Sequence, residues 1–210
     1  MEKRIILVGA GGLAREILSF FDFVDVFGDL LRIDFYIDDT GPSLEKFDYK
    51  INYLGPVSDF IPNSEDYFIM AVADPNIKHN LFDKLVNFHE RFLKIIHPTA
   101  IVAKTSRIGC GSVIFPYAVI SADSEIGNFV NINSMSSVGH DAFVGNFSTL
   151  SAHVDITGGV RVGADVFFGT SACVIPRLKI GDGAKIGAGA TVMRSIKDGQ
   201  TVYTMPAKRL

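Results

Sequence analysis

Residues 131–150 read NINSMSSVGHDAFVGNFSTL, and within this stretch an apolar residue returns at every sixth position. The same phase continues in both directions without a break, which makes 16 apolar positions in a row. With 48% apolar residues in the chain, chance gives such a run with a probability of about 10⁻⁵. The positions are Val102, Ile108, Ile114, Ile120, Ile126, Ile132, Val138, Val144, Leu150, Ile156, Val162, Phe168, Val174, Ile180, Ile186 and Val192.

A period of six fits a short strand followed by a turn, and neither an α-helix nor a hairpin has this period. Three such units make a triangular coil, in which the periodic residues point inward and stack. Glycine often follows the apolar residue, as at Gly139 and Gly145, and we expect it to let the chain turn each corner. The sequence therefore predicts an all-β domain over residues 97–210, a parallel β-helix with a C-terminal tail.

Residues 1–96 have a different pattern, which predicts a small α/β domain with a parallel sheet. A glycine-rich turn separates the first expected strand from the first expected helix. The expected strands are 3–8, 33–37 and 67–73, and the expected helices are 13 to about 26 and 75 to about 89.

Composition excludes several classes of protein. The net charge of −3 and the absence of a charged tail argue against a nucleic-acid partner. No apolar stretch reaches the ~18 residues of a membrane-spanning helix. Arg15 and Glu16 interrupt the apolar N-terminal run, so we expect no signal peptide. The two cysteines, Cys110 and Cys173, form no disulfide framework, which favours the cytoplasm.

His140 is the first candidate for chemistry. It lies two residues after the inward Val138, at an outward position, and Asp141 follows it. An imidazole beside a carboxylate is a general-base pair, although an exposed polar pair at a turn has the same sequence. Gly158 lies 18 residues further, one coil away, where its N–H can polarise an acyl carbonyl or where it simply forms a corner.

Zinc is the alternative use of histidine in a β-helix. The repeats contain only His140 and His153, and His79, His89 and His97 precede them. Because a structural or catalytic zinc site needs at least three protein ligands, we expect no metal site.

The glycine turn Gly9-Ala10-Gly11-Gly12 is a loose phosphate-binding fingerprint between a strand and a helix. Asp38 and Asp39 end the next strand, where a carboxylate can bond a ribose or sugar hydroxyl. Asp74 and Lys78 follow the third strand and can line the same crevice. A capped helix and solvated charges remain the structural alternative for this set.

A stacked β-helix has flat faces and no deep pocket, so its sites usually form between chains. A flat, mostly uncharged prism favours side-by-side packing, and a closed homotrimer is the symmetric solution.

Together, these segments resemble a family of bacterial sugar acyltransferases with a small Rossmann-like N-terminal domain and a left-handed β-helix. The family includes sialic acid O-acetyltransferases and N-acetyltransferases of nucleotide-linked 4-amino-6-deoxy sugars. The resemblance covers essentially the whole chain. The segments that carry it are IILVGAGGLAREI, FYIDD, MAVADPNIKHNL, IIHPTA, VNINSMSSVGHDAFVGNFS and VYTMPAKRL.

The resemblance implies a role for each site residue. His140 matches the catalytic base, Asp141 the acid that orients it, and Asn133 a site asparagine. Acetyl-CoA is the implied co-substrate, bound between subunits. Its matching positions are Gly158 at the thioester, Thr170 and Ala188 along the pantetheine arm, and Lys208 in the ending that closes over the cofactor. Gly9, Gly11, Gly12, Asp38, Asp39 and Lys78 form the nucleotide-sugar side.

Two positions depart from the family pattern. Many relatives have histidine where this chain has Leu13 in the glycine turn, and many have histidine where Thr149 stands, close to the acyl group. The first departure leaves the identity of the sugar open. The second removes a hydrogen-bond donor that the Thr149 hydroxyl can replace.

We therefore expect an acetyl-CoA-dependent N-acetyltransferase of a nucleotide-linked amino sugar, with a 4-amino-4,6-dideoxy sugar as the implied acceptor. Bacterial surface polysaccharide or glycan synthesis is the implied setting. Two alternatives remain open: O-acetylation of sialic acid or another sugar, and a non-catalytic protein that binds nucleotide sugars.

Overall fold

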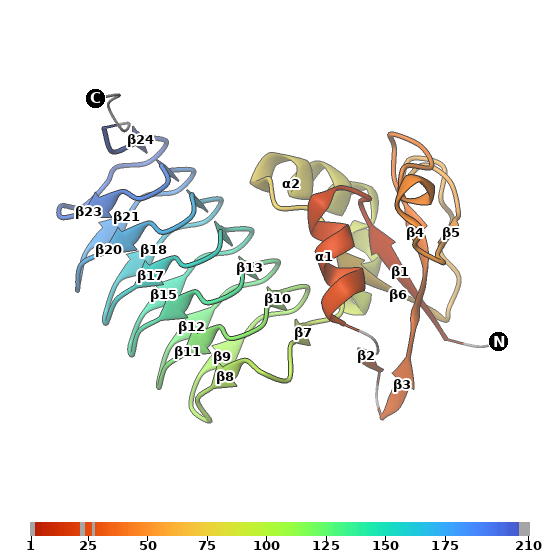
Figure 1. Ribbon diagram of the computed structural model, residues 1–210, viewed down its shortest axis with the longest axis horizontal. Coiled ribbons are helices and arrows are strands. Elements are labelled where there is room, and N and C mark those ends of the chain that lie inside the picture. Colours follow the sequence, from red (N-terminus) through yellow and green to blue (C-terminus); the bar gives the residue numbers. More distant parts are fainter. Residues whose placement is uncertain (1–2, 22–23, 27, 206–210) are drawn as a thin grey trace.

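The chain folds into an α/β unit and a three-sided prism of stacked coils that lie next to each other (Figure 1). The computed structural model describes residues 3–21, 24–26 and 28–205. Among these residues, no helix has the length and hydrophobicity that crossing a membrane requires.

The α/β unit is built on a four-stranded parallel sheet with the order β5-β4-β1-β6. Buried aliphatic residues of β1 and β6 fill both faces of this sheet, as expected for a sheet covered on two sides. The strands are β1 (Arg4–Val8), β4 (Ile33–Ile37), β5 (Asn52–Tyr53) and β6 (Asp66–Met70). The helices are α1 (Gly12–Phe20), α2 (Pro75–Lys84) and the 3₁₀ turns η1 (Leu44–Phe47) and η2 (Val86–Arg91).

The predicted parallel sheet is confirmed, but both helices are shorter than expected. The first ends at Phe20, and Val24–Val26 (β2) pairs with Asp29–Leu31 (β3) as an antiparallel hairpin. The valines at every second position favour a strand, and Gly28, with φ of 91°, allows the turn. The second helix ends at Lys84 and continues as the 3₁₀ turn η2.

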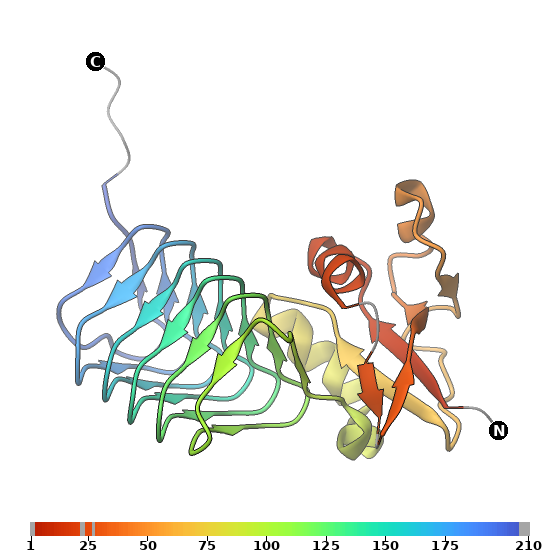
Figure 2. The same cartoon turned by 60° about the horizontal axis from the view of Figure 1, so that its bottom comes forward.

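The prism is the predicted parallel β-helix, and each of its faces is a stack of two-residue strands (Figure 2). The seven-stranded face contains β7 (Ile95–Ile96), β10 (Val113–Ile114), β13 (Asn131–Ile132), β16 (Thr149–Leu150), β19 (Phe167–Phe168), β22 (Lys185–Ile186) and β24 (Thr201–Val202). The six-stranded face contains β8 (Ile101–Val102), β11 (Val119–Ile120), β14 (Ser137–Val138), β17 (Asp155–Ile156), β20 (Cys173–Val174) and β23 (Thr191–Val192). The five-stranded face contains β9 (Arg107–Ile108), β12 (Glu125–Ile126), β15 (Phe143–Val144), β18 (Arg161–Val162) and β21 (Lys179–Ile180).

The periodic apolar residues form one continuous core, since most of them are almost completely buried. The role we predicted for the glycines is wrong, because Gly139 and Gly145 do not have left-handed backbone conformations. Instead, a Cβ on Gly145 would lie 2.4 Å from the carbonyl carbon of Gly163 in the next coil. These glycines therefore allow coils to stack closely, and the left-handed corners are mostly occupied by other residues, such as Asp141 and Phe147.

The stack extends past the six-residue pattern at both ends. Strand β7 pairs with β10, so the first rung precedes residue 97. After Val192 the next rung is two residues short, yet Ile196 still bridges to Ile180 and β24 pairs with β22. The coil therefore tolerates a shorter corner at its end, which a strict period of six does not reveal.

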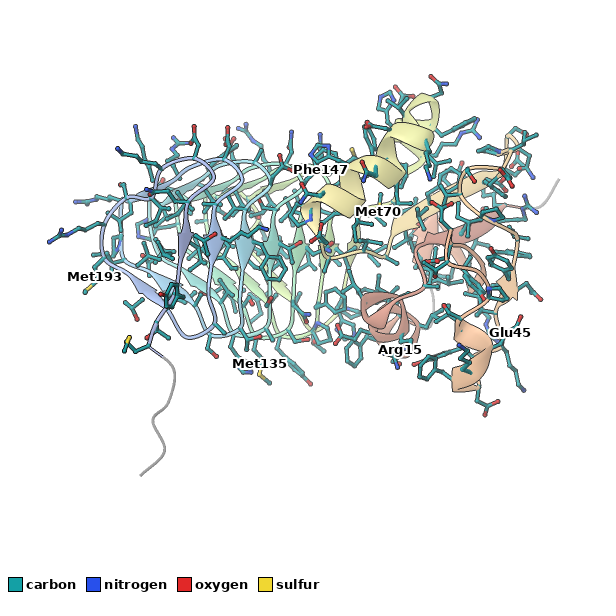
Figure 3. The ribbon with its side chains drawn as sticks, turned by 90° about the horizontal axis from the view of Figure 1, so that it is seen from above. Arg15, Glu45, Met70, Met135, Phe147 and Met193 are labelled. Atoms are coloured by element: carbon teal, nitrogen blue, oxygen red, sulfur yellow. The ribbon has the colours of Figure 1, made fainter. Side chains whose placement is uncertain are left out.

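The seven-stranded face carries the α/β unit. The outward side chains Val113, Asn131 and Thr149 are buried beneath it, and Phe21 packs edge-to-face on Phe115. On the other side of the contact, α2 meets the prism near Phe147 (Figure 3).

Lys78 lies at the centre of this junction. Its side chain is fully buried, and its Nζ donates to the carbonyls of Phe129 (3.0 Å) and Ser148 (3.2 Å) in two successive coils. Burial lowers the pKa of Lys78 to about 7, although the carboxylates of Asp165 and Asp74 act in the opposite direction. A titratable group therefore holds the two units together.

Lys78 gives the junction a predictable pH dependence. The folded chain releases this proton near pH 7, whereas the unfolded chain keeps it to about pH 10.5. Because the unfolded state binds more protons between these values, the free energy of unfolding of the wild type should rise with pH relative to that of Lys78→Met. Urea unfolding from about pH 7 to about pH 9 measures this difference.

Lys46→Met, a change of an exposed lysine, is the matched control and should follow the wild type across this range. Parallel curves for the wild type and Lys78→Met would contradict the assignment.

Candidate active site

His140 and Asp141 form the pair that the sequence predicts. The His140 Nδ1 lies 2.7 Å from the Asp141 Oδ2, and the His140 side chain is 72% exposed. Asp141 occupies a left-handed corner with φ of 57°, which places its carboxylate beside the ring. With Nδ1 engaged by the carboxylate, Nε2 is left as the nitrogen that can accept a proton from a substrate.

The pair lies on the edge between the six-stranded and five-stranded faces, which we call the His140 edge. Each coil contributes two corner residues to it. From the N-terminal coil onward these are Lys104–Thr105, Ala122–Asp123, His140–Asp141, Gly158–Gly159, Pro176–Arg177 and Arg194–Ser195.

Gly158 lies directly against the histidine. A Cβ built on Gly158 would be only 2.6 Å from the His140 Nε2, so the ring occupies the space where a side chain would stand. The corner is held by hydrogen bonds from the Gly159 N–H to the His140 carbonyl and from the Arg177 N–H to the Gly158 carbonyl. Among the described residues, nothing accepts a hydrogen bond from the Gly158 N–H. A free backbone donor therefore stands beside a free imidazole nitrogen.

The other predicted acetyl-CoA positions lie on a different edge. Thr170 and Ala188 are corner residues between the seven-stranded and six-stranded faces, which we call the Thr170 edge. Neither backbone N–H has a partner among the described residues. Asn133 belongs to the same edge, where its Nδ2 lies 3.4 Å from the Glu16 carboxylate of α1. Within one chain, the full width of the six-stranded face separates these residues from His140.

Two predicted site residues belong instead to the junction between the units. Thr149 is 4% exposed, and its hydroxyl donates to the Ala73 carbonyl at 2.6 Å. Lys78 is enclosed by the backbone carbonyls described above. Because both side chains are buried and hydrogen-bonded, they are not placed to contact an acyl group or a nucleotide sugar.

A cavity of about 580 Å³ opens at the carboxyl ends of β1, β4 and β6. Gly11, Gly12 and Asp38, three of the predicted substrate residues, line it. Gly11 caps α1 without any side-chain hydrogen bond, which leaves the first-turn N–H groups of the helix open to an anion. In an open parallel sheet, this end of the strands is the usual location of a ligand site.

Asp38 organises the glycine turn. Its carboxylate accepts hydrogen bonds from the Ala10 N–H at 2.7 Å and from Thr40, so it shapes the cavity wall. Gly9 lets the same turn pass close to Val72. Its φ is 105°, and a Cβ there would lie 2.5 Å from Val72.

Asp39 is not one of the residues that line this cavity, and its carboxylate pairs with Lys84 at 2.6 Å. Burial alone would raise the pKa of Asp39, but hydrogen bonds from Lys84 and the Ser58 N–H lower it overall. Its carboxylate thus ties the end of β4 to the last turn of α2.

Sequence reasoning missed Arg15 and Phe47. The Arg15 guanidinium lies 4.0 Å above the Phe47 ring, and both residues line the cavity. Arg15 is the one cationic side chain among the described lining residues, and Figure 3 shows it on α1. The sequence shows that Arg15 lies one helical turn after the glycines, which is a signal that could have identified it. The sequence does not show that η1 packs over it.

The remaining predictions concern Lys208, His153 and metal binding. Lys208 lies outside the described residues. His153 is an exposed corner residue of the Thr170 edge. Across the described part of the chain, no three His, Cys, Asp or Glu side chains gather as metal ligands would.

Comparison with known proteins identifies solved structures that have the same fold. The sequence matches no protein-family model and no curated protein. The structure matches the acetyltransferase domain of PglB from Neisseria gonorrhoeae FA1090, with a TM-score of 0.85, 26% identity and complete coverage of both chains. The same domain is known in complex with acetyl coenzyme A.

Two more solved structures match this chain with similar TM-scores. PerB from Caulobacter crescentus, solved with CoA and GDP-perosamine, has a TM-score of 0.84 and 26% identity over 98% of this chain and 96% of the other. WeeI from Acinetobacter baumannii AYE has a TM-score of 0.82 and 24% identity over 99% and 100%, and so shares the fold. The resemblance seen in the sequence is confirmed, since the chain shares its fold over nearly its whole length with the acetyltransferase domain of PglB and with PerB.

Proposed function

We propose that this chain is an acetyl-CoA-dependent N-acetyltransferase that acts on a nucleotide-linked amino sugar. One observation carries the proposal: the His140–Asp141 pair stands against Gly158, whose N–H is free. A base and an oxyanion donor on adjacent corners of one edge are the groups that acyl transfer needs. The matching structures contain acetyl-CoA in PglB, and CoA with GDP-perosamine in PerB.

In this mechanism, the neutral amine of the sugar attacks the thioester carbon. His140 Nε2 accepts the proton that the nitrogen loses, and the Asp141 carboxylate stabilises the imidazolium. The Gly158 N–H donates to the oxyanion of the tetrahedral intermediate. When the C–S bond breaks, the CoA thiolate leaves, and the imidazolium can return its proton to the sulfur. Holding both reactants in one place contributes much of the acceleration.

The cavity of the α/β unit supports a nucleotide-linked acceptor. Free N–H groups at the start of α1 and the Arg15 guanidinium suit a diphosphate. Leu13, Ile77 and Val72 make much of the remaining wall apolar, which suits a deoxy sugar with a methyl group. We further propose that this unit is a Rossmann-like domain and that the β-helix is left-handed. We also propose that the protein acts in the cytoplasm, in the synthesis of bacterial surface glycans.

The separation of the two edges supports a homotrimer with shared sites. Thr170 and Ala188 cannot meet His140 of their own chain, because one face of the prism lies between the edges. If the Thr170 edge of one copy packs beside the His140 edge of the next, free N–H groups line both sides of a groove. Exposed apolar side chains of Ile101, Tyr117 and Met135 lie at and beside the Thr170 edge, as such packing requires.

The activity itself is tested by acetyl-CoA consumption with a panel of nucleotide-linked amino sugars. We expect turnover with one or more 4-amino sugars, and none with the 4-hydroxy analogue. Turnover of the hydroxy sugar or of free sialic acid would support O-acetylation instead. Binding of a nucleotide sugar without binding of acetyl-CoA would support a non-catalytic role.

Removal of the base gives the second prediction. His140→Ala should lower kcat by roughly 10²-fold or more, because the substitution removes the base that accepts the proton. Asp141→Asn should lower kcat less, since asparagine tolerates the left-handed corner but cannot stabilise the imidazolium. His89→Asn, which changes an exposed histidine of η2 in the α/β unit, is the control and should keep full activity. Unchanged turnover in His140→Ala would remove this residue from the mechanism.

Gly158→Ala gives the third prediction. The added Cβ would meet the His140 ring at 2.6 Å and displace it, so kcat should fall by about 10²-fold. The free energy of unfolding should change by less than about 1 kcal/mol, because an exposed ring can move. Gly183→Asn, a left-handed corner with open space around it, serves as the control. Full activity of Gly158→Ala would mean that catalysis does not depend on the position of the His140 ring.

A further inference from the structure

His153 is the one histidine of the chain whose side chain has no hydrogen-bond partner among the described residues. A side-chain hydrogen bond is made by each of the others, which are His79, His89, His97 and His140. The His153 ring is exposed on the Thr170 edge. Its backbone has φ of 60°, and its N–H donates to the Ser134 carbonyl at 3.1 Å. A hydrogen-bonded corner therefore presents an imidazole with both ring nitrogens free.

The corner residues of the Thr170 edge change in size at His153. On its N-terminal side, the left-handed corners carry the large exposed side chains of Tyr117 and Met135. On its C-terminal side they carry only Ser171 and Gly189. A Cβ built on Gly189 would stand in open space, 3.8 Å from its nearest neighbour. In the proposed trimer, the groove beside the next copy is therefore narrow up to His153 and open beyond it.

Free backbone donors of this edge begin at the same level. The Ser134 N–H is bound by the Asn133 side chain at 2.6 Å. In each of the next three coils, the first corner residue has an N–H with no acceptor in the described part of the chain, and these residues are Ala152, Thr170 and Ala188. Amide carbonyls accept such donors, and the long arm of acetyl-CoA contains two amides. The line of donors therefore suits that arm, with the thioester sulfur at its head, beside His153.

Three-fold packing brings His153 of one copy to the level of His140 in the next. When prisms pack side by side along their edges, the same residue lies at the same height in every copy. One coil takes 18 residues, as the pairing of Ser137 with Asp155 shows, and it rises by ~4.8 Å. His153 comes 13 residues after His140 and is thus ~3.5 Å further along the axis, whereas Gly158 is ~4.8 Å further. The imidazole therefore stands at a height between the base and the oxyanion donor.

We propose that the His153 imidazole of one copy completes the active site of the next by donating a ring N–H to the sulfur of acetyl-CoA while the C–S bond breaks. This hydrogen bond stabilises the negative charge that develops on the leaving thiolate. It transfers no proton, because the proton that finally reaches the sulfur is the one that His140 takes from the amine. The two imidazoles thus act on opposite sides of the reacting carbon. The inference rests on the proposed function and on its trimer.

Removal of the imidazole is the first test. His153→Gly takes the side chain away without straining the corner, since glycine accepts a positive φ. With acetyl-CoA and an accepted amino sugar, kcat should fall by roughly tenfold or more, because a hydrogen bond to a charged group is lost. Added imidazole should restore part of the rate in the variant and have no effect on the wild type. Asp48→Gly, the same change at an exposed position with φ of 56° in the α/β unit, is the control and should keep the kcat of the wild type.

Mixed trimers test whether the two imidazoles come from different copies. His140→Ala and His153→Gly chains with different affinity tags are co-expressed in equal amounts, and trimers that carry both tags are purified. A complete site forms wherever His140 of one variant meets His153 of the other, which random assembly gives at about one quarter of the sites. Turnover should approach this fraction of the wild-type rate. A variant that merely misfolds would not restore activity in this way.

Wild-type kcat in His153→Gly would overturn the inference. Mixed trimers no more active than the average of the two single variants would overturn it as well. Both results leave the proposed function standing, because the wild type still acetylates its acceptor. A wild type that consumes no acetyl-CoA with any nucleotide-linked amino sugar would instead remove the proposed function.

Discussion

The stacking of one coil on the next is the constraint on which the rest of this structure depends. Each coil donates backbone hydrogen bonds to the coil that follows and buries an aliphatic residue on every face. Close stacking requires a residue without a side chain where two backbones approach, as at Gly139 beneath Thr157 and Gly158. The same approach places His140 against Gly158. The geometry of the candidate site is thus a direct result of how the coils stack.

Much of this arrangement is readable in the sequence because the period is local. The inward column, the general outline of both units, and the His140–Asp141 pair all follow from spacing along the chain. What spacing cannot give is the contact between the units. Thr149 and Lys78 have the residue types of a binding site, yet they satisfy carbonyl groups at a buried junction. Their roles depend on which face of the prism the α/β unit covers, and no local pattern contains that information.

The first helix shows a related limit. Its apolar spacing continues past Phe20, so a helical pattern extends into residues that pair as a hairpin. Phe21 also leaves the helix to pack on Phe115 and His97 of the prism. Tertiary packing therefore overrides the helical pattern at this boundary. Arg15 illustrates the converse, because its place in the chain is visible in the sequence but its partner Phe47 comes from a distant segment.

The left-handed corners of the prism have a broader consequence. Residues as different as Tyr117, Asp141, Phe147 and Arg177 have nearly the same φ there. The coil dictates the corner conformation, so the identity of the side chain is largely free to vary. Each edge thus presents corner side chains at a regular spacing of one coil, and these side chains can be exchanged without altering the scaffold. Insertion of a whole coil would add one corner to each edge and keep every face in register, whereas insertion of a single six-residue rung would move all the following strands onto the next face.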